Sequence, residues 1–171
     1  MVLQKNTVLQ AFHKRILDYC DETLKEPPVK RIKEGKRLLG VSRIVLKRVF
    51  YLSYAYRMTS EEKYLRRAEK EMLAAASFTD WNPSHFLDVS EMSMGLAIGY
   101  DWLFNELLPD SRKKIRQAIV EKAIEASKTK HASFYKSRTN WNQVCNGGLV
   151  CSALAIYEDE PEKTKEIINK A

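Results

Sequence analysis

The chain is poor in glycine, proline and cysteine, and each shortage excludes a class of structure. Six glycines and five prolines among 171 residues are too few for the many turns of an all-β chain. The three cysteines, Cys20, Cys145 and Cys151, have no metal-ligand spacing, and their odd number provides no disulfide framework. We therefore expect free and mostly buried thiols.

Several functional motifs are also missing. There is no apolar run long enough to cross a bilayer. The first residues, 1–6, lead into an amphipathic helix and not into the apolar region of a signal peptide. The sequence has no glycine-rich nucleotide motif, and no His, Cys and Asp cluster has ligand spacing. We therefore expect no cofactor, no metal and no membrane association.

The residues that are present indicate a folded, basic protein. Hydrophobic residues make up 44% and charged residues 30%, which is too apolar for a disordered chain. The net charge of +7 favours an acidic partner, such as an anionic polysaccharide, nucleic acid or an acidic membrane. A solvated surface with surplus lysine would have the same charge. DNA binding would depend on charge alone, without a recognisable reading helix, so we expect no nucleic acid.

Apolar spacing and capping residues predict helices throughout the chain. Asn6 is the expected N-cap of the first helix, and Pro161 is expected in the first turn of the last. The segment 29–40 is basic and expected to be irregular, and the Lys30–Arg48 cluster is expected to be exposed, with polyanion guidance as the alternative. The expected helices are 7–25, 42–58, 60–78, 87–107, 109–130, 144–157 and one from residue 161.

The helices alternate in character. An apolar helix rich in small residues ends near Tyr56, Tyr100 and Tyr157, and each time a charged helix follows. The period is irregular, roughly 40 to 60 residues, within the range of helical-pair repeats. An inner helix that contacts neighbours on most sides is apolar nearly all round. A solenoid of helical pairs would show the same pattern, but the irregular period and long loops favour helical hairpins that form part of an incomplete α/α toroid.

Two stretches have the composition of a binding site. The stretch 140–148 contains Asn140, Trp141, Asn142 and Asn146 and ends in a Gly-Gly pair, which costs a helix about 2 kcal/mol relative to Ala-Ala. We expect a loop there. Neutral amides beside an indole suit a polar, ring-shaped ligand, because the ring stacks on a sugar and the amides bond its hydroxyl or carboxylate groups.

The second stretch, 81–92, is similar in composition and also precedes a helix. It contains Trp81, Asn82, His85 and the acid pair Asp88 and Glu91, which are three apart and share a helix face. Each has an ordinary interpretation as well. The tryptophans could be hydrophobic plugs, His85 could cap the helix, and acids in a first turn usually stabilise the helix N-terminus.

These motifs resemble those of the heparinase II/III-like polysaccharide lyases and their alginate-lyase relatives. The resemblance lies in Trp-Asn-Pro-Ser-His-Phe-Leu-Asp at 81–88, Ala-Ile-Gly-Tyr-Asp-Trp-Leu at 97–103 and Asn-Trp-Asn-Gln-Val-Cys-Asn-Gly-Gly at 140–148. It implies an incomplete α/α toroid followed by a β-sandwich region, β-elimination at a uronic acid, an acidic polysaccharide as partner, and a periplasmic or secreted parent protein.

The resemblance also implies roles for particular residues. A carboxylate-neutralising donor is expected at Asn142, with Asn140 and Asn146 next and His85 as a weaker candidate. The substrate-binding residues would be Trp81, Asn82, Glu91, Asn140, Trp141 and Asn146. The catalytic base is not identified.

The length sets a further expectation. At 171 residues the chain is one domain, 1–171, shorter than the toroid of the family and without its β region. We therefore expect a fragment of a larger lyase that is inactive alone and forms a homo-oligomer through apolar groups and its last helix. The groups expected to be uncovered are Leu96, Ile98, Leu149, Leu154 and Ile156.

Two other functions stay open. One is an α/α-toroid glycoside hydrolase with Asp88 or Glu91 as the acid. The other is a non-catalytic helical-repeat module that binds partners.

Overall fold

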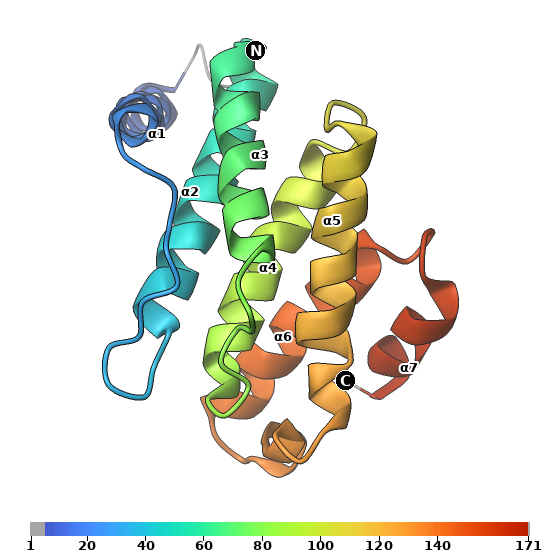
Figure 1. Ribbon diagram of the computed structural model, residues 1–171. Helices are drawn as coiled ribbons and strands as arrows, with labels where there is room; N and C mark the ends of the chain where they lie inside the picture. Colours follow the sequence, from blue (N-terminus) through green and yellow to red (C-terminus); the bar gives the residue numbers. More distant parts are fainter. Residues whose placement is uncertain (1–5, 171) are drawn as a thin grey trace.

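The computed structural model describes residues 6–170 as an all-α protein (Figure 1). No β-strand occurs in this range apart from one isolated bridge between Glu34 and Arg37. The helices are α1 (Thr7–Lys25), α2 (Leu39–Thr59), α3 (Glu62–Ala76), α4 (Phe86–Trp102), α5 (Pro109–Ile119), the π-helical turn η2 (Val120–Ile124), the 3-10 turns η3 (Ala126–Lys128) and η4 (Ala132–Lys136), α6 (Asn140–Ala155) and α7 (Pro161–Lys170).

The helix boundaries follow from local chemistry at most positions. The Asn6 side chain accepts hydrogen bonds from the amides of Val8 and Leu9, so the expected N-cap of α1 is confirmed. Pro109 and Pro161 begin α5 and α7, where a missing amide hydrogen costs nothing. The helix expected over 60–78 begins two residues later, at Glu62, because Ser60 ends α2 in the left-handed conformation and its side chain caps no helix.

The helices lie in two layers. The long apolar helices α2, α4 and α6 run side by side in the same direction, since Ser42 bonds to Asp88 near the start of both α2 and α4, and Ser90 bonds to Val144 near the start of α4 and α6. The charged helices α3, α5 and α7 pack on one side of this layer and return in the opposite direction (Figure 1). The expected alternation of inner and outer helices is therefore present, and closure into a toroid stays a prediction.

Glycines set the spacing within the inner layer. A Cβ atom on Gly95 would lie 2.8 Å from the Cα atom of Leu46 on α2. A Cβ atom on Gly148 would lie 2.5 Å from the carbonyl oxygen of Ser90 on α4. Both distances are shorter than any side chain tolerates, so α4 can approach α2 and α6 this closely only because these two positions lack side chains.

The inner helices bury most of the apolar groups that we expected to be uncovered. Leu96, Leu149 and Ile156 are fully buried, and so is Ile167 in α7 apart from 2% of its surface. For Leu96, Leu149 and Ile156 the expectation is wrong, because these side chains belong to the hydrophobic core, and Ile98 is half-buried. Leu154 is 60% exposed, so the expected self-association stays a prediction that now depends on a much smaller apolar surface.

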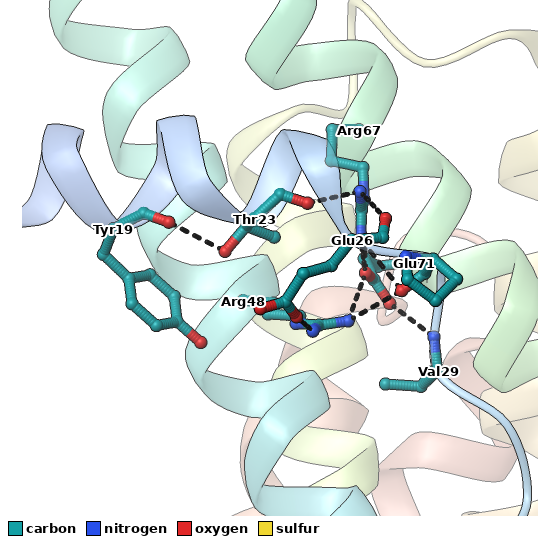
Figure 2. A network of polar contacts seen from close by, with 8 residues as sticks. Tyr19, Thr23, Glu26, Val29, Arg48, Arg67 and Glu71 are labelled. Atoms are coloured by element: carbon teal, nitrogen blue, oxygen red, sulfur yellow. Dashed lines mark hydrogen bonds and ion pairs between the residues drawn. The ribbon is translucent and has the colours of Figure 1, made fainter.

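α1 stands apart from both layers and is seen almost end-on in Figure 1, beside α2 and α3. Its C-terminal end is held by a network of buried charges, shown in Figure 2. Arg48 and Arg67 both donate to the fully buried Glu71, which also accepts the amide hydrogen of Val29. Arg67 further donates to the carbonyl oxygen of Thr23, at 2.5 Å.

This network corrects one expectation. Arg48 was expected on a solvent-exposed basic cluster, but its side chain is almost completely buried and is ion-paired to Glu71 and Glu26. A buried arginine needs such partners, because an unpaired charge in the interior costs several kcal/mol. The basic residues of 30–37 lie in a separate loop, in which Arg31 bonds to Asp80 and Lys33 bonds to Asn82.

Candidate functional site

A buried carboxylate and a histidine form the centre of the candidate site, at the end of the molecule where α2, α4 and α6 begin. His85 is the last residue before α4, and its Nδ1 atom lies 2.5 Å from Oδ1 of Asp88 in the first turn. The Asp88 side chain is fully buried, whereas 14% of the His85 side chain is exposed. The Asp88 carboxylate thus fixes one ring nitrogen of His85 and leaves the other, Nε2, as the one able to reach a ligand.

Three segments of the chain converge on Asp88. Its Oδ2 atom accepts the backbone amide of Leu38 and the side-chain amide of Asn82, both at 2.6 Å. Its backbone carbonyl accepts the hydroxyl of Ser42. The carboxylate therefore joins the loop 26–38, the loop 77–85 and α4, and its acceptor sites are filled by the protein itself.

Asn82 is a positioning residue in this arrangement. Its backbone is left-handed, with φ of 62°, a conformation that asparagine tolerates better than most residues. Its amide group donates to Asp88 and to the carbonyl of Lys36, and its oxygen accepts from Lys33 at 3.2 Å. Asn82 is buried, so these contacts assign it to the support of the site and leave no surface for a substrate.

Asp80, two residues before Asn82, also stabilises the loop 77–85. It accepts the Asn82 amide at 2.6 Å and an ion pair from Arg31 at 2.7 Å. Burial alone would raise the pKa of the Asp80 carboxyl, but Arg31 and the Asn82 amide outweigh it and hold that pKa below its usual value.

Trp141 completes the cluster from the next inner helix. Its ring stands edge-on to the His85 ring, with the two ring centroids 4.9 Å apart and an interplanar angle of 84°. The structure therefore brings together one residue from each of the two stretches that the sequence singled out. The Trp141 ring is partly exposed, as a sugar-stacking residue must be.

The stretch 140–148 is helical, so the expected loop there is wrong. Thr139 caps α6 by accepting the amide of Trp141, and the helix begins at Asn140. The close contact of Gly148 with Ser90 outweighs the poor helix propensity of the asparagines and glycines. The amide side chains consequently project from the first two turns of a helix.

Asn140 and Asn142 line a polar surface hollow of about 390 Å³ at this helix start, together with Ser137, Arg138, Thr139 and Gln143. Asn140 is exposed. The Asn142 amide nitrogen donates to the carbonyls of Phe134 and Tyr135 at 3.3 and 3.2 Å, which ties η4 to α6. A substrate carboxylate would have to compete with these two carbonyls for Asn142.

The other predicted residues lie in different surroundings. Trp81 is fully buried and its indole donates to the carbonyl of Ala75, so it is a core residue with no face for a sugar. Glu91 is paired in two hydrogen bonds with Arg43 of α2, at 2.9 and 3.1 Å. The Oδ1 atom of Asn146 is buried and has no hydrogen-bond partner among the described residues.

The site lies at the end of the inner helices where the connecting segments are basic, which we call the basic end. The three segments that lead into α2, α4 and α6, residues 26–38, 77–85 and 129–139, contain eight lysines and arginines and three acids. The three connections at the opposite end, residues 60–61, 103–108 and 156–160, contain five acids and no basic residue. The inner helices also direct the positive ends of their dipoles toward the basic end.

His85, Trp141 and Asp88 were all candidates from the sequence, but the contacts between them were not predicted. The spacing of His85 and Asp88, three apart at a helix start, was the available signal. The contacts of Asp88 with Leu38 and Asn82 join positions far apart in the chain, and no local pattern predicts them.

No family model matches the chain, and no curated protein matches it either. Within residues 6–170, no three His, Cys, Asp or Glu side chains are grouped so that they could hold a metal ion. None of the helices described there is both long and apolar enough to cross a bilayer.

Proposed function

We propose that this chain binds an acidic polysaccharide at its basic end and belongs to the helical part of a lyase that cleaves uronic-acid polymers by β-elimination. The observation that carries the proposal is the His85 ring, held by the buried Asp88 and placed edge-on to Trp141. A sugar stacked on Trp141 would have its polar groups within reach of His85 and of the hollow at Asn140.

The chemistry that this cluster could supply is stabilisation of negative charge. In β-elimination a base removes the proton next to the uronate carboxylate, and the charge that develops on that group must be stabilised. Nδ1 of His85 is engaged with Asp88, so Nε2 is the ring nitrogen left to contact this group. The start of α6 adds amide hydrogens and the positive end of a helix dipole.

The surrounding charge supports an anionic ligand over a neutral one. Lys36, Arg37, Lys136 and Arg138 are exposed on the segments around the cluster, and none of them has a carboxylate ion-pair partner in the part of the chain that the structure describes. Such a field raises the local concentration of a polyanion and the rate at which it arrives.

The contacts of Asp88 and Glu91 do not favour the alternative function, an α/α-toroid glycoside hydrolase. A hydrolase of that kind needs two carboxyl groups that reach the scissile bond. Asp88 is fully buried with its acceptor sites filled, and Glu91 is neutralised by Arg43. A non-catalytic binding module would use the same surface without any chemistry.

Binding is tested on the chain itself, with alginate and heparan sulfate as acidic polymers and dextran as the neutral control. We expect calorimetry to detect binding of at least one acidic polymer and none of dextran. Trp141→Ala and His85→Ala should each weaken this binding, whereas His131→Ala, on a neighbouring turn, should not. If dextran bound as tightly as the acidic polymers, or if no polymer bound, the proposal would be wrong.

The reaction is tested on the full reading frame that encodes this chain. A lyase forms a carbon–carbon double bond conjugated to the carboxylate, so its products gain ultraviolet absorbance. A hydrolase would release reducing ends without that absorbance, and a binding module would produce neither signal.

A further inference from the structure

One face of α2 carries alternating cations and aromatic rings. The spacing of these residues along the chain is four, three, four and three, so they form one stripe along the helix. By helical geometry the stripe lies opposite Val45 and Leu52, which are fully buried. We call it the α2 stripe, and it consists of Arg43, Lys47, Phe50, Tyr54 and Arg57.

Phe50 of the stripe lies against two further aromatic rings. The centroid of the Phe50 ring lies 5.9 Å from that of Tyr51 and 5.3 Å from that of Trp102 at the end of α4. Phe50 is 37% exposed, which is unusual for a phenylalanine in the middle of an inner helix. A hollow of about 250 Å³ between α4 and α6 borders Trp102 and extends this surface.

The cations lie against these rings. The Lys47 ammonium lies 4.0 Å from the ring centroid of Tyr19 on α1, and the Arg57 guanidinium lies 5.9 Å from that of Trp102. Neither has a carboxylate partner among residues 6–170. Rings hold both charges, Arg57 also donates to the carbonyl oxygen of Trp102 at 3.2 Å, and neither charge is neutralised by an acid there.

The α2 stripe is continuous with the site described above. Its first residue, Arg43, is bonded to Glu91, which is one turn along α4 from Asp88. From there the stripe follows α2 away from the basic end. A chain bound at His85 and Trp141 could therefore extend along it.

We propose that the α2 stripe is a second binding surface for the same acidic sugar chain, with Phe50 and Trp102 contacting sugar faces and Lys47 and Arg57 binding carboxylate or sulfate groups. This inference rests on the proposed function. Neighbouring rings are inclined by 47° and 50°, so they offer separate small faces and not the parallel platform on which successive bases stack. That geometry favours a sugar chain over a single-stranded nucleic acid.

The test compares four variants of the chain. Phe50→Ala removes the exposed ring of the stripe, and the double variant Lys47→Gln with Arg57→Gln removes its two cations. Tyr157→Ala, an exposed ring after α6, and the double variant Lys113→Gln with Lys114→Gln, on the outer helix α5, are the matched controls. Far-ultraviolet circular dichroism and melting temperature verify that each variant folds like the parent chain.

Affinity for long alginate and heparan sulfate chains is measured at two salt concentrations, beside a single-stranded oligonucleotide. Loss of one aromatic contact should weaken sugar binding about three- to tenfold. The double variant should lose at least as much and should show a smaller salt dependence, while both controls bind normally.

The outcomes separate the two proposals. Normal affinity in both stripe variants, with weakened binding in Trp141→Ala, would overturn the stripe and leave the proposed function standing. No binding of acidic sugar by the parent chain would overturn both. Binding of the oligonucleotide through the stripe, at an affinity equal to that of the sugars, would identify a nucleic acid as the partner and overturn this inference alone.

Discussion

Asp88 is a single residue on which several loops depend, and its substitution should have a large effect. Changing it to asparagine keeps the shape but removes the charge that accepts from Leu38, Asn82 and His85. Hydrogen bonds to a charged group contribute about 1.5–3 kcal/mol each, and the new amide group would face donors. We expect Asp88→Asn to lower the free energy of unfolding by about 3 kcal/mol.

Urea denaturation measures this loss. Asp18→Asn is the matched control, because Asp18 forms an exposed ion pair with Lys14 on α1, and such pairs contribute about 0–1 kcal/mol. If Asp88→Asn were as stable as Asp18→Asn, the cluster would be a set of weak surface contacts.

The cysteines provide a second test at the residue scale. All three are free, and Cys20 and Cys145 are fully buried. Burial raises the pKa of each of these two thiols to about 12, with Asp21 adding to the effect at Cys20. Since the thiolate is the reactive form, we expect iodoacetamide at neutral pH to modify the partly exposed Cys151 first.

Mass spectrometry of peptides from the native protein identifies the modified residue. Cys20 and Cys145 should react only after denaturation. Rapid labelling of Cys145 in the native state would mean that α6 separates readily from α4.

At the scale of helices, the neighbouring glycines 147 and 148 have opposite roles. A side chain on Gly148 would overlap Ser90, whereas nothing lies within 4 Å of a side chain on Gly147. We therefore expect Gly148→Ala to destabilise the protein by about 1–3 kcal/mol through overpacking. Gly147→Ala should stabilise it by up to about 1 kcal/mol through helix propensity.

The two variants control each other, since the chemical change is identical. Thermal unfolding should show shifts of opposite sign. Shifts of the same sign would contradict the packing of α6 against α4 at Ser90.

The same helices show which parts of the fold were predictable. The bounds of α1 followed from Asn6 and from the proline pair after it, and α5 and α7 began at their prolines, because capping is a property of neighbouring residues. The start of α6 was missed by four residues, because the contact between Gly148 and Ser90 joins residues 58 positions apart and outweighs local propensity.

The candidate site was predictable in its residue types but not in its connections. The sequence singled out His85 and Trp141 by composition, and the structure brings their rings together. The sequence also suggested Trp81 as a sugar-stacking residue, but the Trp81 side chain is fully buried and its indole donates to the carbonyl of Ala75. Two tryptophans in similar motifs differ in burial because one precedes the turn at Asn82 and the other lies on a helix, a distinction set by tertiary packing.

At the scale of the whole molecule, the separation of charge predicts how binding responds to salt. The basic end and the exposed arginines and lysines around His85 would attract an acidic polymer, and this attraction is screened over about 10 Å at 0.1 M salt and about 3 Å at 1 M. We expect Arg37→Gln combined with Lys136→Gln to weaken alginate binding severalfold at low salt and very little at high salt.

Lys113→Gln combined with Lys114→Gln is the control for the same loss of charge, since both residues are exposed on the outer helix α5. Calorimetric titrations at low and high salt provide the comparison. Equal weakening by both double variants would mean that only net charge matters and that the basic end has no special role.

The polarity of the molecule also affects the events before contact. The connections at one end of the inner helices hold eight basic residues and three acids, whereas those at the other end hold five acids, three of which pair with Lys63, Arg116 and Lys163. If the ligand is an acidic polymer, as proposed, the excess of basic residues around His85 would favour encounters in which that end of the molecule faces the polymer. The arrangement would then act on the frequency of productive collisions, before any contact is made.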